Sequence, residues 1–172
     1  VKRIVVVSST RVYGENHGAV INDDSPTIPC DEQGNLLLKM EELWQQAYPN
    51  ECVIVRPTGI YGTSSARMVK LAEVTKTYSN IHWSNRIHIY DLANFLAHLL
   101  HVEHPEKSYI CTNNQPQPLH EMILKIQRDL NLPELVLQSQ NETGKKIFAD
   151  NMVKSGYKLK HDSCLLDYRK VL

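Results

Sequence analysis

The sequence has 172 residues, a length that suits one compact domain with a sizeable hydrophobic core. Its 19 basic residues balance its 19 acidic residues, which argues against a nucleic-acid or anionic-membrane surface as the main partner. No apolar run approaches the roughly 18 residues that cross a bilayer, and no signal-peptide pattern is present. Because the four cysteines are scattered without a C-x-x-C pair, we expect reduced thiols in a cytoplasmic protein.

The predicted elements begin with two strands separated by a loop and a helix. The β-branched run at 4–7 predicts a strand buried on both faces, as in a parallel sheet, and 52–56 predicts a second one. Residues 15–33 are polar and contain glycine and proline, which predicts a loop. Residues 35–47 suit a helix, and its expected apolar side carries Leu36, Leu37, Met40, Leu43 and Trp44.

The rest of the chain continues the alternation of helix and strand. Helices are predicted over 67–77, 92–102, 118–130 and 145–155, with strands over 86–89 and 108–112 and a last short helix within 162–172. Asp91 is expected to cap the second of these helices, and Gly156 is a natural terminator of the fourth. In the third helix the expected apolar face carries Leu119, Met122, Ile123 and Ile126. Alternating strands and helices predict an α/β fold with a mainly parallel sheet.

Three segments, in order along the chain, carry a resemblance to a known family. They are IVVVSSTRVYG at 4–14, VIVRPTGIYG at 53–62 and NRIHIYDLANFLAHLL at 85–100. Together they resemble the extended short-chain dehydrogenases/reductases, and within them the NAD-dependent nucleoside-diphosphate-sugar epimerases/dehydratases. The closing segment 144–172 is similar to the tail of the same branch. The resemblance covers essentially the whole chain and matches only the C-terminal two-thirds of such a protein.

The resemblance implies an incomplete Rossmann-like doubly wound parallel sheet with a small C-terminal substrate-binding lobe. Residues 1–62 would form the remaining back half of the Rossmann-like domain. Residues 63–172 would form the substrate-side lobe, with 86–112 returning to the sheet. Because the chain opens at Val1 directly into a strand, we expect a truncation of about 100 residues, or three βα units. The strand at 4–7 would then leave a bare apolar edge, which predicts self-association into a homo-oligomer or a missing N-terminal segment.

The resemblance also implies a site beyond the carboxyl ends of the strands. Ser9 falls on the family position that hydrogen-bonds the reacting hydroxyl, so it is the candidate catalytic residue, and Thr10 follows it on the substrate side. Serines here could instead merely satisfy backbone groups where a strand ends.

The second and third segments supply the other candidate site residues. Pro57 and Thr58 match cofactor-facing positions, and Gly59 matches the substrate side. Arg86 lies close to where relatives contact the nucleotide diphosphate, for which a guanidinium is well suited. His88 is interpreted as structural.

Two family features are absent from the sequence. No G-x-G-x-x-G or related glycine pattern is present to seat a pyrophosphate at a helix N-terminus. When the helix is registered on Glu41, the family's Tyr-x-x-x-Lys pair falls on Gln33 and Leu37, neither of which can exchange a proton or supply charge. We therefore expect NAD or NADP as the cofactor of the intact protein and no cofactor bound by this fragment.

Two hypotheses remain open. The first is a fragment of an NAD(P)-dependent nucleotide-sugar epimerase, dehydratase or reductase, whose substrate is a nucleotide sugar or a similar small polar molecule. The alternative is a degenerate, non-catalytic Rossmann-like module that binds a nucleotide or a protein. No metal site is expected, because no second ligand set converges on the spaced histidines His98, His101 and His104. Tyr13 and Tyr61 flank the expected pocket and could substitute as proton donors, although packing is the simpler role for both.

Overall fold

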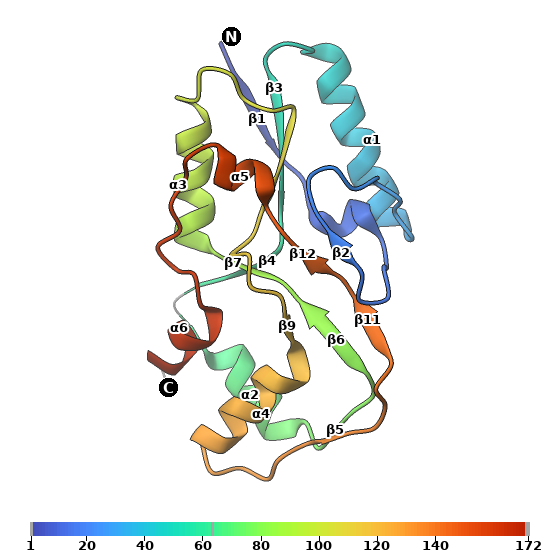
Figure 1. Ribbon diagram of the computed structural model, residues 1–172, viewed down its shortest axis with the longest axis vertical. Coiled ribbons are helices and arrows are strands. Elements are labelled where there is room, and N and C mark those ends of the chain that lie inside the picture. The colour runs from blue at the N-terminus through green and yellow to red at the C-terminus, as the bar shows by residue number, and fades with distance from the viewer. Residues whose placement is uncertain (1, 63, 171–172) are drawn as a thin grey trace.

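The computed structural model describes residues 2–62 and 64–170, which form an α/β structure with helices on both sides of a short parallel sheet (Figure 1). In this main sheet, the strand β3 (Cys52–Pro57) lies between β1 (Ile4–Val7) and β8 (Ser108–Cys111), and both pairings are parallel. The parallel α/β fold expected from the alternating elements is therefore confirmed. The described residues do not form one large doubly wound sheet, however, because the remaining strands pair in four smaller sheets.

Helices cover both faces of the main sheet. On one face, Cys52 and Ile54 pack with Val6 and with Met40 of the helix α1 (Glu32–Ala47). On the other face, Val53 and Val55 belong to the largest core cluster, which includes buried residues of the helix α3 (Ile89–Leu99). Every residue of β3 is buried as a result, as the apolar run predicts for a central parallel strand.

The first strand and the first helix each differ from their predicted burial. In β1, Val7 is 46% exposed, because within the described residues this strand has a partner on only one side. In α1, the inward stripe runs through Gly34, Leu37, Leu38 and Glu41, at the 3- and 4-residue spacing of a helix face. The expected apolar side was wrong, since Leu36, Leu43 and Trp44 lie outside this stripe and are exposed.

The remaining elements are short. The first half contains the 3-10 helix η1 (Thr10–Tyr13), β2 (Val20–Ile21), β4 (Gly59–Tyr61), α2 (Ala66–Val74), β5 (Thr77–Tyr78), β6 (Ile81–Ser84) and β7 (Arg86–His88). The second half contains β9 (Gln117–Pro118), α4 (Leu119–Asp129), β10 (Val136–Leu137), β11 (Glu142–Gly144), β12 (Lys146–Ile147), α5 (Asp150–Lys154) and α6 (Cys164–Lys170). Four parallel pairings, β2–β12, β4–β7, β5–β10 and β6–β11, together with the antiparallel pairing β6–β9, connect them.

A second core lies between α2 and α4, at the opposite end of the molecule from the N-terminus (Figure 1). Met122, Ile123 and Ile126 of α4 are buried there against Met68 and Ala72 of α2. The apolar face predicted for α4 is thus confirmed, with Leu119 only partly buried at its start.

Two predicted boundaries are corrected. Residues 145–155 do not form one helix, because Lys146 and Ile147 pair with β2 and α5 begins only at Asp150. The same pairing places a strand inside the predicted loop 15–33. Gly156 has a φ of 83° just after α5, which confirms its role as a left-handed terminator. The predicted tail helix is α6, and residues 171–172 lie outside the described part.

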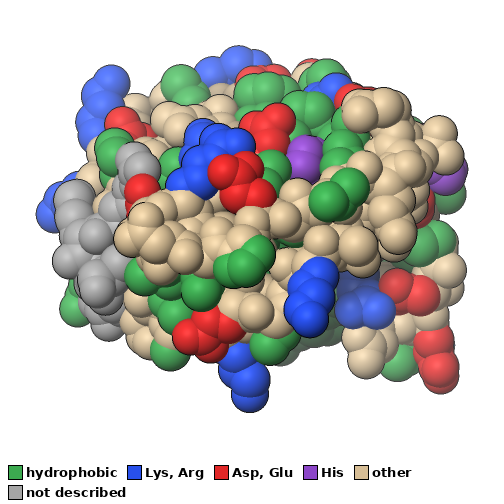
Figure 2. All heavy atoms as spheres, turned by 90° about the horizontal axis from the view of Figure 1, so that it is seen from below, with side chains coloured by type: hydrophobic (Ala, Val, Ile, Leu, Met, Phe, Trp, Pro, Cys, Tyr) green, Lys and Arg blue, Asp and Glu red, His purple; other side chains and the backbone are tan. Residues whose placement is uncertain are grey.

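The surface and the cysteines agree with the reading of the composition. All four cysteines are free. Among the described residues, no helix is long and apolar enough to cross a bilayer. Seen from the α2 and α4 end, positive and negative side chains are interspersed with polar and apolar ones (Figure 2).

Candidate functional site

A cavity of about 290 Å³ lies beyond the carboxyl ends of β1 and β3 and brings together four of the six predicted site residues. Thr10, Thr58, Gly59 and Arg86 all line it. They come from η1, from the junction of β3 and β4, and from β7, which are far apart in the sequence. This location is where parallel α/β sheets bind ligands.

Ser9 and Pro57 do not line the cavity. The hydroxyl of Ser9 accepts a hydrogen bond from the Arg11 amide at 3.1 Å and caps η1. Pro57 is buried, and its carbonyl accepts a hydrogen bond from the Thr10 hydroxyl at 3.3 Å. In this geometry Ser9 satisfies a backbone group at the end of a strand, the simpler of its two interpretations.

The threonine hydroxyls at the strand ends bond to one another and to the backbone. The Thr58 hydroxyl donates to Thr112 Oγ1 at 3.1 Å, and the Thr112 hydroxyl in turn donates to the Arg86 carbonyl at 3.3 Å. These contacts hold the end of β3 and the start of β7 in a fixed relation. Thr10 and Thr58 therefore shape the cavity and offer few free donors to a ligand.

Arg86 is an unpaired cation in this cavity. Its Nε is buried and has no hydrogen-bond partner among the described residues, in which no carboxylate forms an ion pair with it either. In the parallel pairing of β4 with β7, Gly59 lies opposite Arg86. A Cβ at Gly59 would stand 2.7 Å from Arg86 Nη1, so only glycine leaves room for the guanidinium there. A buried donor without a partner normally marks a missing ligand or water.

A second, smaller cavity adjoins the first through Arg86. It measures about 190 Å³ and is lined by Arg86, Arg67 and Ser64 together with apolar residues and Tyr168 of α6. No hydrogen bond or ion pair involves the Arg67 side chain among the described residues. Two guanidinium groups without carboxylate partners thus face one hollow, an arrangement that favours an anionic ligand.

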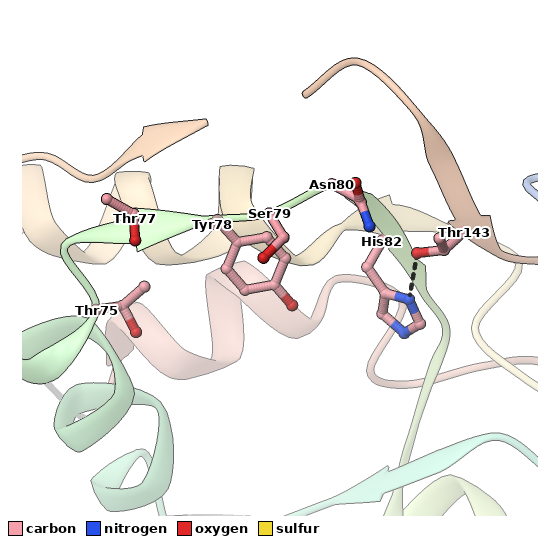
Figure 3. Close-up of a pocket in the computed structure, with 7 residues that line it drawn as sticks. All are labelled: Thr75, Thr77, Tyr78, Ser79, Asn80, His82 and Thr143. Atoms are coloured by element: carbon pink, nitrogen blue, oxygen red, sulfur yellow. Dashed lines mark hydrogen bonds between the residues drawn. The ribbon is translucent and has the colours of Figure 1, made fainter. Parts of the chain in front are cut away.

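The largest cavity, of about 440 Å³, adjoins the first through His82 and contains no charged side chain (Figure 3). His82 Nδ1 lies 3.0 Å from Thr143 Oγ1, which fixes the ring between the two cavities. The lining side chains carry hydroxyl, amide or imidazole groups: Thr75, Thr77, Tyr78, Ser79, Asn80, His82 and Thr143. Such a lining suits a neutral, hydrogen-bonding part of a ligand.

Several cavity residues were not predicted from the sequence. Lys145 and Glu15 line the cavity opposite Arg86, and so does Trp83, whose indole Nε1 is buried without a partner in the described residues. Lys145 reaches the cavity because its amine bonds to the carbonyl of Gly14, 131 positions earlier in the chain. No local pattern in the sequence signals a contact of that range.

Neither the missing dyad nor the two substitute tyrosines supply an acid–base group to the cavity. Gln33 is exposed on α1, and Leu37 is partly buried in the core. Tyr13 OH accepts a hydrogen bond from Arg56 Nη1 at 2.9 Å, and burial raises its pKa. Tyr61 OH donates to Asp167 Oδ2 at 2.7 Å, and burial followed by this carboxylate raises its pKa strongly. Both tyrosines are therefore engaged in packing contacts, the simpler of their two expected roles.

The described residues do not fit the pyrophosphate of a dinucleotide. Such a group needs free backbone amides at a helix N-terminus that follows a Gly-rich turn. The N-terminus of α1 is instead capped by its own Asp31, whose Oδ1 accepts the Gly34 amide at 2.7 Å. The N-terminus of α3 is capped by His88. Only the nicotinamide end could contact these residues, through the surroundings of Thr10 and Thr58.

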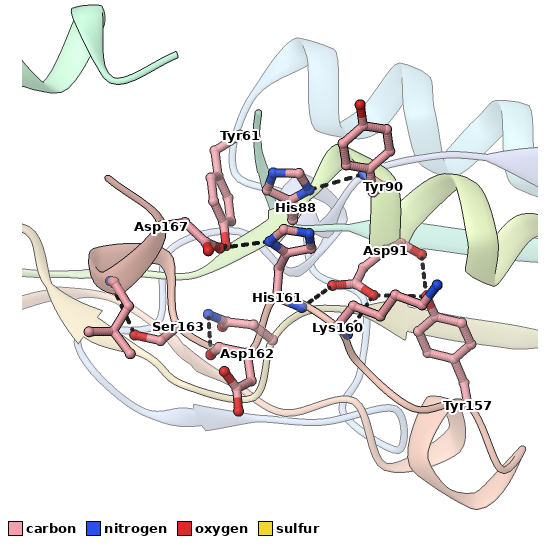
Figure 4. Close-up of polar contacts among 12 residues, drawn as sticks. Tyr61, His88, Tyr90, Asp91, Tyr157, Lys160, His161, Asp162, Ser163 and Asp167 are labelled. Atoms are coloured by element: carbon pink, nitrogen blue, oxygen red, sulfur yellow. Dashed lines mark hydrogen bonds and ion pairs between the residues drawn. The ribbon is translucent and has the colours of Figure 1, made fainter. Parts of the chain in front are cut away.

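A polar cluster beside the cavity corrects the expected role of Asp91 (Figure 4). Asp91 is fully buried and caps no helix; its carboxylate accepts Tyr157 OH at 2.9 Å and the amides of Lys160 and His161 at 3.0 and 2.8 Å. The helix cap is His88, whose Nδ1 accepts the Tyr90 amide. The cap prediction failed because the carboxylate points toward the C-terminal segment instead of the helix start.

His88 is buried and stacks on His161, with ring centroids 3.7 Å apart, so its interpretation as a structural residue fits this position. Among the spaced histidines, His98 Nε2 bonds to the Ser155 carbonyl, while His101 and His104 are exposed. The described residues contain no group of three metal-ligating side chains.

No model of a known protein family matches this chain, and no curated protein sequence matches it either. Solved structures do match. One is a provisionally named NAD-dependent epimerase/dehydratase from Methylobacillus flagellatus, with 30% identity over 99% of this chain and a TM-score of 0.84. The chain spans only 63% of that protein's length.

Two more distant matches show the fold alone. One is dTDP-glucose 4,6-dehydratase from Bacillus anthracis in complex with NAD, with 16% identity, a TM-score of 0.78 and coverage of 98% of this chain and 61% of the dehydratase. The other is UDP-N-acetylglucosamine 4-epimerase from Methanobrevibacter ruminantium in complex with UDP-N-acetylmuramic acid, with 14% identity, a TM-score of 0.75 and coverage of 99% and 62%. The chain therefore matches, over somewhat less than two thirds of their length, the structures of NAD-dependent epimerases/dehydratases of the extended short-chain dehydrogenase type.

Proposed function

We propose that this chain forms the substrate-binding part of an NAD(P)-dependent epimerase, dehydratase or reductase that acts on a nucleotide sugar. The observation that carries the proposal is Arg86, a cation without a partner whose guanidinium faces two adjoining cavities. A diphosphate beside Arg86 and Arg67 would supply the missing acceptors, since each guanidinium offers a planar set of donors that matches phosphate oxygens.

The neighbouring cavities suit the uncharged parts of such a ligand. The hydroxyl-lined cavity around Tyr78 and His82 offers many neutral donors and acceptors. The cavity around Thr10 and Gly59 lies at the strand ends, where the reacting part of a ligand would be held. Similar proteins support this assignment, because the Methanobrevibacter epimerase was solved with UDP-N-acetylmuramic acid and the Bacillus dehydratase with NAD.

In this proposal the cofactor, NAD or NADP, contacts the described residues only by its nicotinamide end, near Thr58 and Thr10. A bound nicotinamide would supply hydride transfer. The residues of this chain would bind the nucleotide sugar, orient it by its phosphates, and exclude water from the reacting carbon.

A non-catalytic nucleotide-binding module is the second candidate, and one observation favours it. Gln33 and Leu37 stand where the family's acid–base pair would be, and neither lines the cavity. Such a module would bind nucleotide sugars through Arg86 in the same way and would not turn them over.

Calorimetric titration with a panel of nucleoside diphosphates and nucleotide sugars tests the proposal, and Arg86→Met is the decisive variant. Loss of charge-assisted hydrogen bonds to phosphate should weaken binding by about 10- to 100-fold. The matched control is Arg128→Met, because Arg128 is exposed and paired with Glu134 away from the cavities. Equal affinities in the two variants, or no binding by the wild type, would contradict the proposal. Turnover of a bound sugar with NAD or NADP separates the enzyme from the non-catalytic module.

A further inference from the structure

Lys145 is a second cation in the cavity that contains Arg86, and the proposed binding function does not use it. Besides lining that cavity, Lys145 lines a neighbouring hollow of about 200 Å³ together with Cys30 and Asp31. Asp31 is the N-cap of α1. The amine therefore lies between the ligand cavity and the start of α1, close to the turn that carries Gln33 in place of the family tyrosine.

The amine of Lys145 is held in place without being neutralised. Its Nζ donates a hydrogen bond to the carbonyl of Gly14. It forms no ion pair among the described residues, although Glu15 is nearby. The Glu15 Oε1 already accepts the amides of Asn16, His17 and Gly144. A neutral amine in this position can keep its bond to Gly14 and still present a lone pair to the cavity.

The surroundings of Lys145 favour the neutral form. Burial lowers the pKa of Lys145, while Glu15, Cys30 and Asp31 oppose the shift without cancelling it. Asp31 is engaged at 2.9 Å by Arg11, which lines the same hollow, so its charge is largely compensated. Across the cavity the charged group is Arg86, which disfavours a second positive charge, and His82 stands beside it.

On the basis of the proposed function, we propose that Lys145 exchanges a proton with an oxygen of the bound nucleotide sugar, in place of the tyrosine that this chain lacks. In one direction the O–H bond of a sugar hydroxyl breaks, its electron pair stays on oxygen, and the proton adds to the lone pair of Nζ. In the other direction the ammonium returns the proton to the oxygen. General acid–base assistance of this kind contributes about 100- to 10,000-fold to a rate.

The first test measures the amine itself and needs no turnover. The protein is treated with a small acylating reagent between about pH 6 and about pH 11, and labelling of each lysine is followed by mass spectrometry. In the folded protein Lys145 should become reactive at a lower pH than the same lysine in the urea-unfolded chain. Saturating nucleotide sugar should slow labelling of Lys145 and leave the exposed Lys154 unchanged. Lys145 reactivity that rises at the same pH in the folded and unfolded chains would overturn the inference.

The second test separates a proton-exchange role from a purely cationic one. Lys145→Arg keeps the charge, but a guanidinium does not deprotonate in proteins. We expect Lys145→Arg to bind nucleotide sugars within a few-fold of wild type and to lose about 100-fold or more in kcat. The wild-type rate should rise with pH through the lowered pKa of Lys145, and this limb should vanish in the variant. The control variant is Lys154→Met at the exposed end of α5.

The outcomes distinguish this inference from the proposed function. Full turnover by Lys145→Arg would show that only the charge matters and would overturn the inference, while binding through Arg86 would stand. A shifted labelling profile without any nucleotide-sugar binding would overturn the proposed function and, with it, the role of the amine toward such a ligand. Binding, protection of Lys145 and a rate loss confined to the Lys145 variants would support both.

Discussion

Two polar regions meet on the strand β7 and differ in whether their polar groups have partners. At its first residue, Arg86 has a buried Nε without a partner in the described chain. At its last residue, His88 enters a cluster in which the buried Asp91 carboxylate accepts a hydroxyl and two amides. A satisfied polar network holds a fold together, and an unsatisfied one is completed by a ligand. The comparison teaches that the cluster is structural and the cavity is functional.

This comparison makes a general prediction about substitutions. Changes in satisfied clusters should lower stability and leave ligand affinity of the folded protein unchanged. Changes at Arg86 or Lys145 should do the reverse. The four predictions below test the stability side, in order of decreasing expected effect.

The largest effect is expected from Glu41→Ala. Glu41 is 1% exposed and pairs with Arg56 at 2.7 Å, and Arg56 also donates to Tyr13. Removing one partner leaves a buried, uncompensated charge, which typically costs about 3–5 kcal/mol. Urea unfolding should show this loss, against a change within about 0.5 kcal/mol for the exposed neighbour Glu42→Ala. Equal stability of the two variants would refute the structural role, and Glu41→Gln is the milder substitute if the alanine variant fails to fold.

Asp91→Asn should cost about 2–3 kcal/mol, because an amide group turned toward these donors leaves at least one of them unsatisfied. The donors are Tyr157 OH and the amides of Lys160 and His161. Chemical denaturation measures the loss, with the exposed Asp24→Asn as control. A loss of nucleotide-sugar affinity in folded Asp91→Asn would instead assign this cluster to the binding site.

Tyr61→Phe should cost about 1 kcal/mol, the usual contribution of one hydrogen bond. Its hydroxyl donates to Asp167, so no turnover should depend on it. Tyr48→Phe is the control, since Tyr48 is exposed and stacks on Trp44 through its ring. A fall in kcat for Tyr61→Phe without a fall in stability would revive this tyrosine as a proton donor.

The smallest effect concerns pH. Burial, and then the neighbouring His161, lowers the pKa of His88 in the folded protein. The unfolded chain therefore binds more protons just below its histidine pKa of about 6.5, and stability should fall as the pH drops through that value. The groups facing His88 are His161, Asp167, Asp91, Tyr90 and Tyr61.

The substitution His88→Asn isolates this contribution, because asparagine is also a good N-cap for the Tyr90 amide. Urea midpoints at pH values above and below 6.5 should show a shallower pH dependence in the variant. An unchanged slope would place the pH sensitivity elsewhere.

The sequence predicted the main sheet more accurately than the rest of the fold. β3 was predicted because an unbroken β-branched run can be buried on both faces. The two- and three-residue strands β2, β10 and β12 were missed, because they form only where distant segments pair. The helix α1 was found, but its buried side was misjudged because the Arg56–Glu41 ion pair, and not the apolar residues, sets its orientation.

The site was predicted in part for the same reason. Thr10, Thr58, Gly59 and Arg86 lie in motifs at strand ends, and the topology brings these ends together. Lys145 has no motif, and only the contact with Gly14 places it in the cavity. Asp91 was assigned a local role although its partners lie 66 to 70 positions later.

The pairing of β2 with β12 has a consequence for synthesis on the ribosome. Val20 and Ile21 cannot find Lys146 and Ile147 until about 120 further residues have been made. At about 5–20 residues per second, the early segment spends on the order of ten seconds without its partner strand. The 290 Å³ cavity, whose wall includes Glu15 from the early segment and Lys145 from the late one, therefore closes only near the end of translation. A nascent chain should gain its binding competence late and all at once.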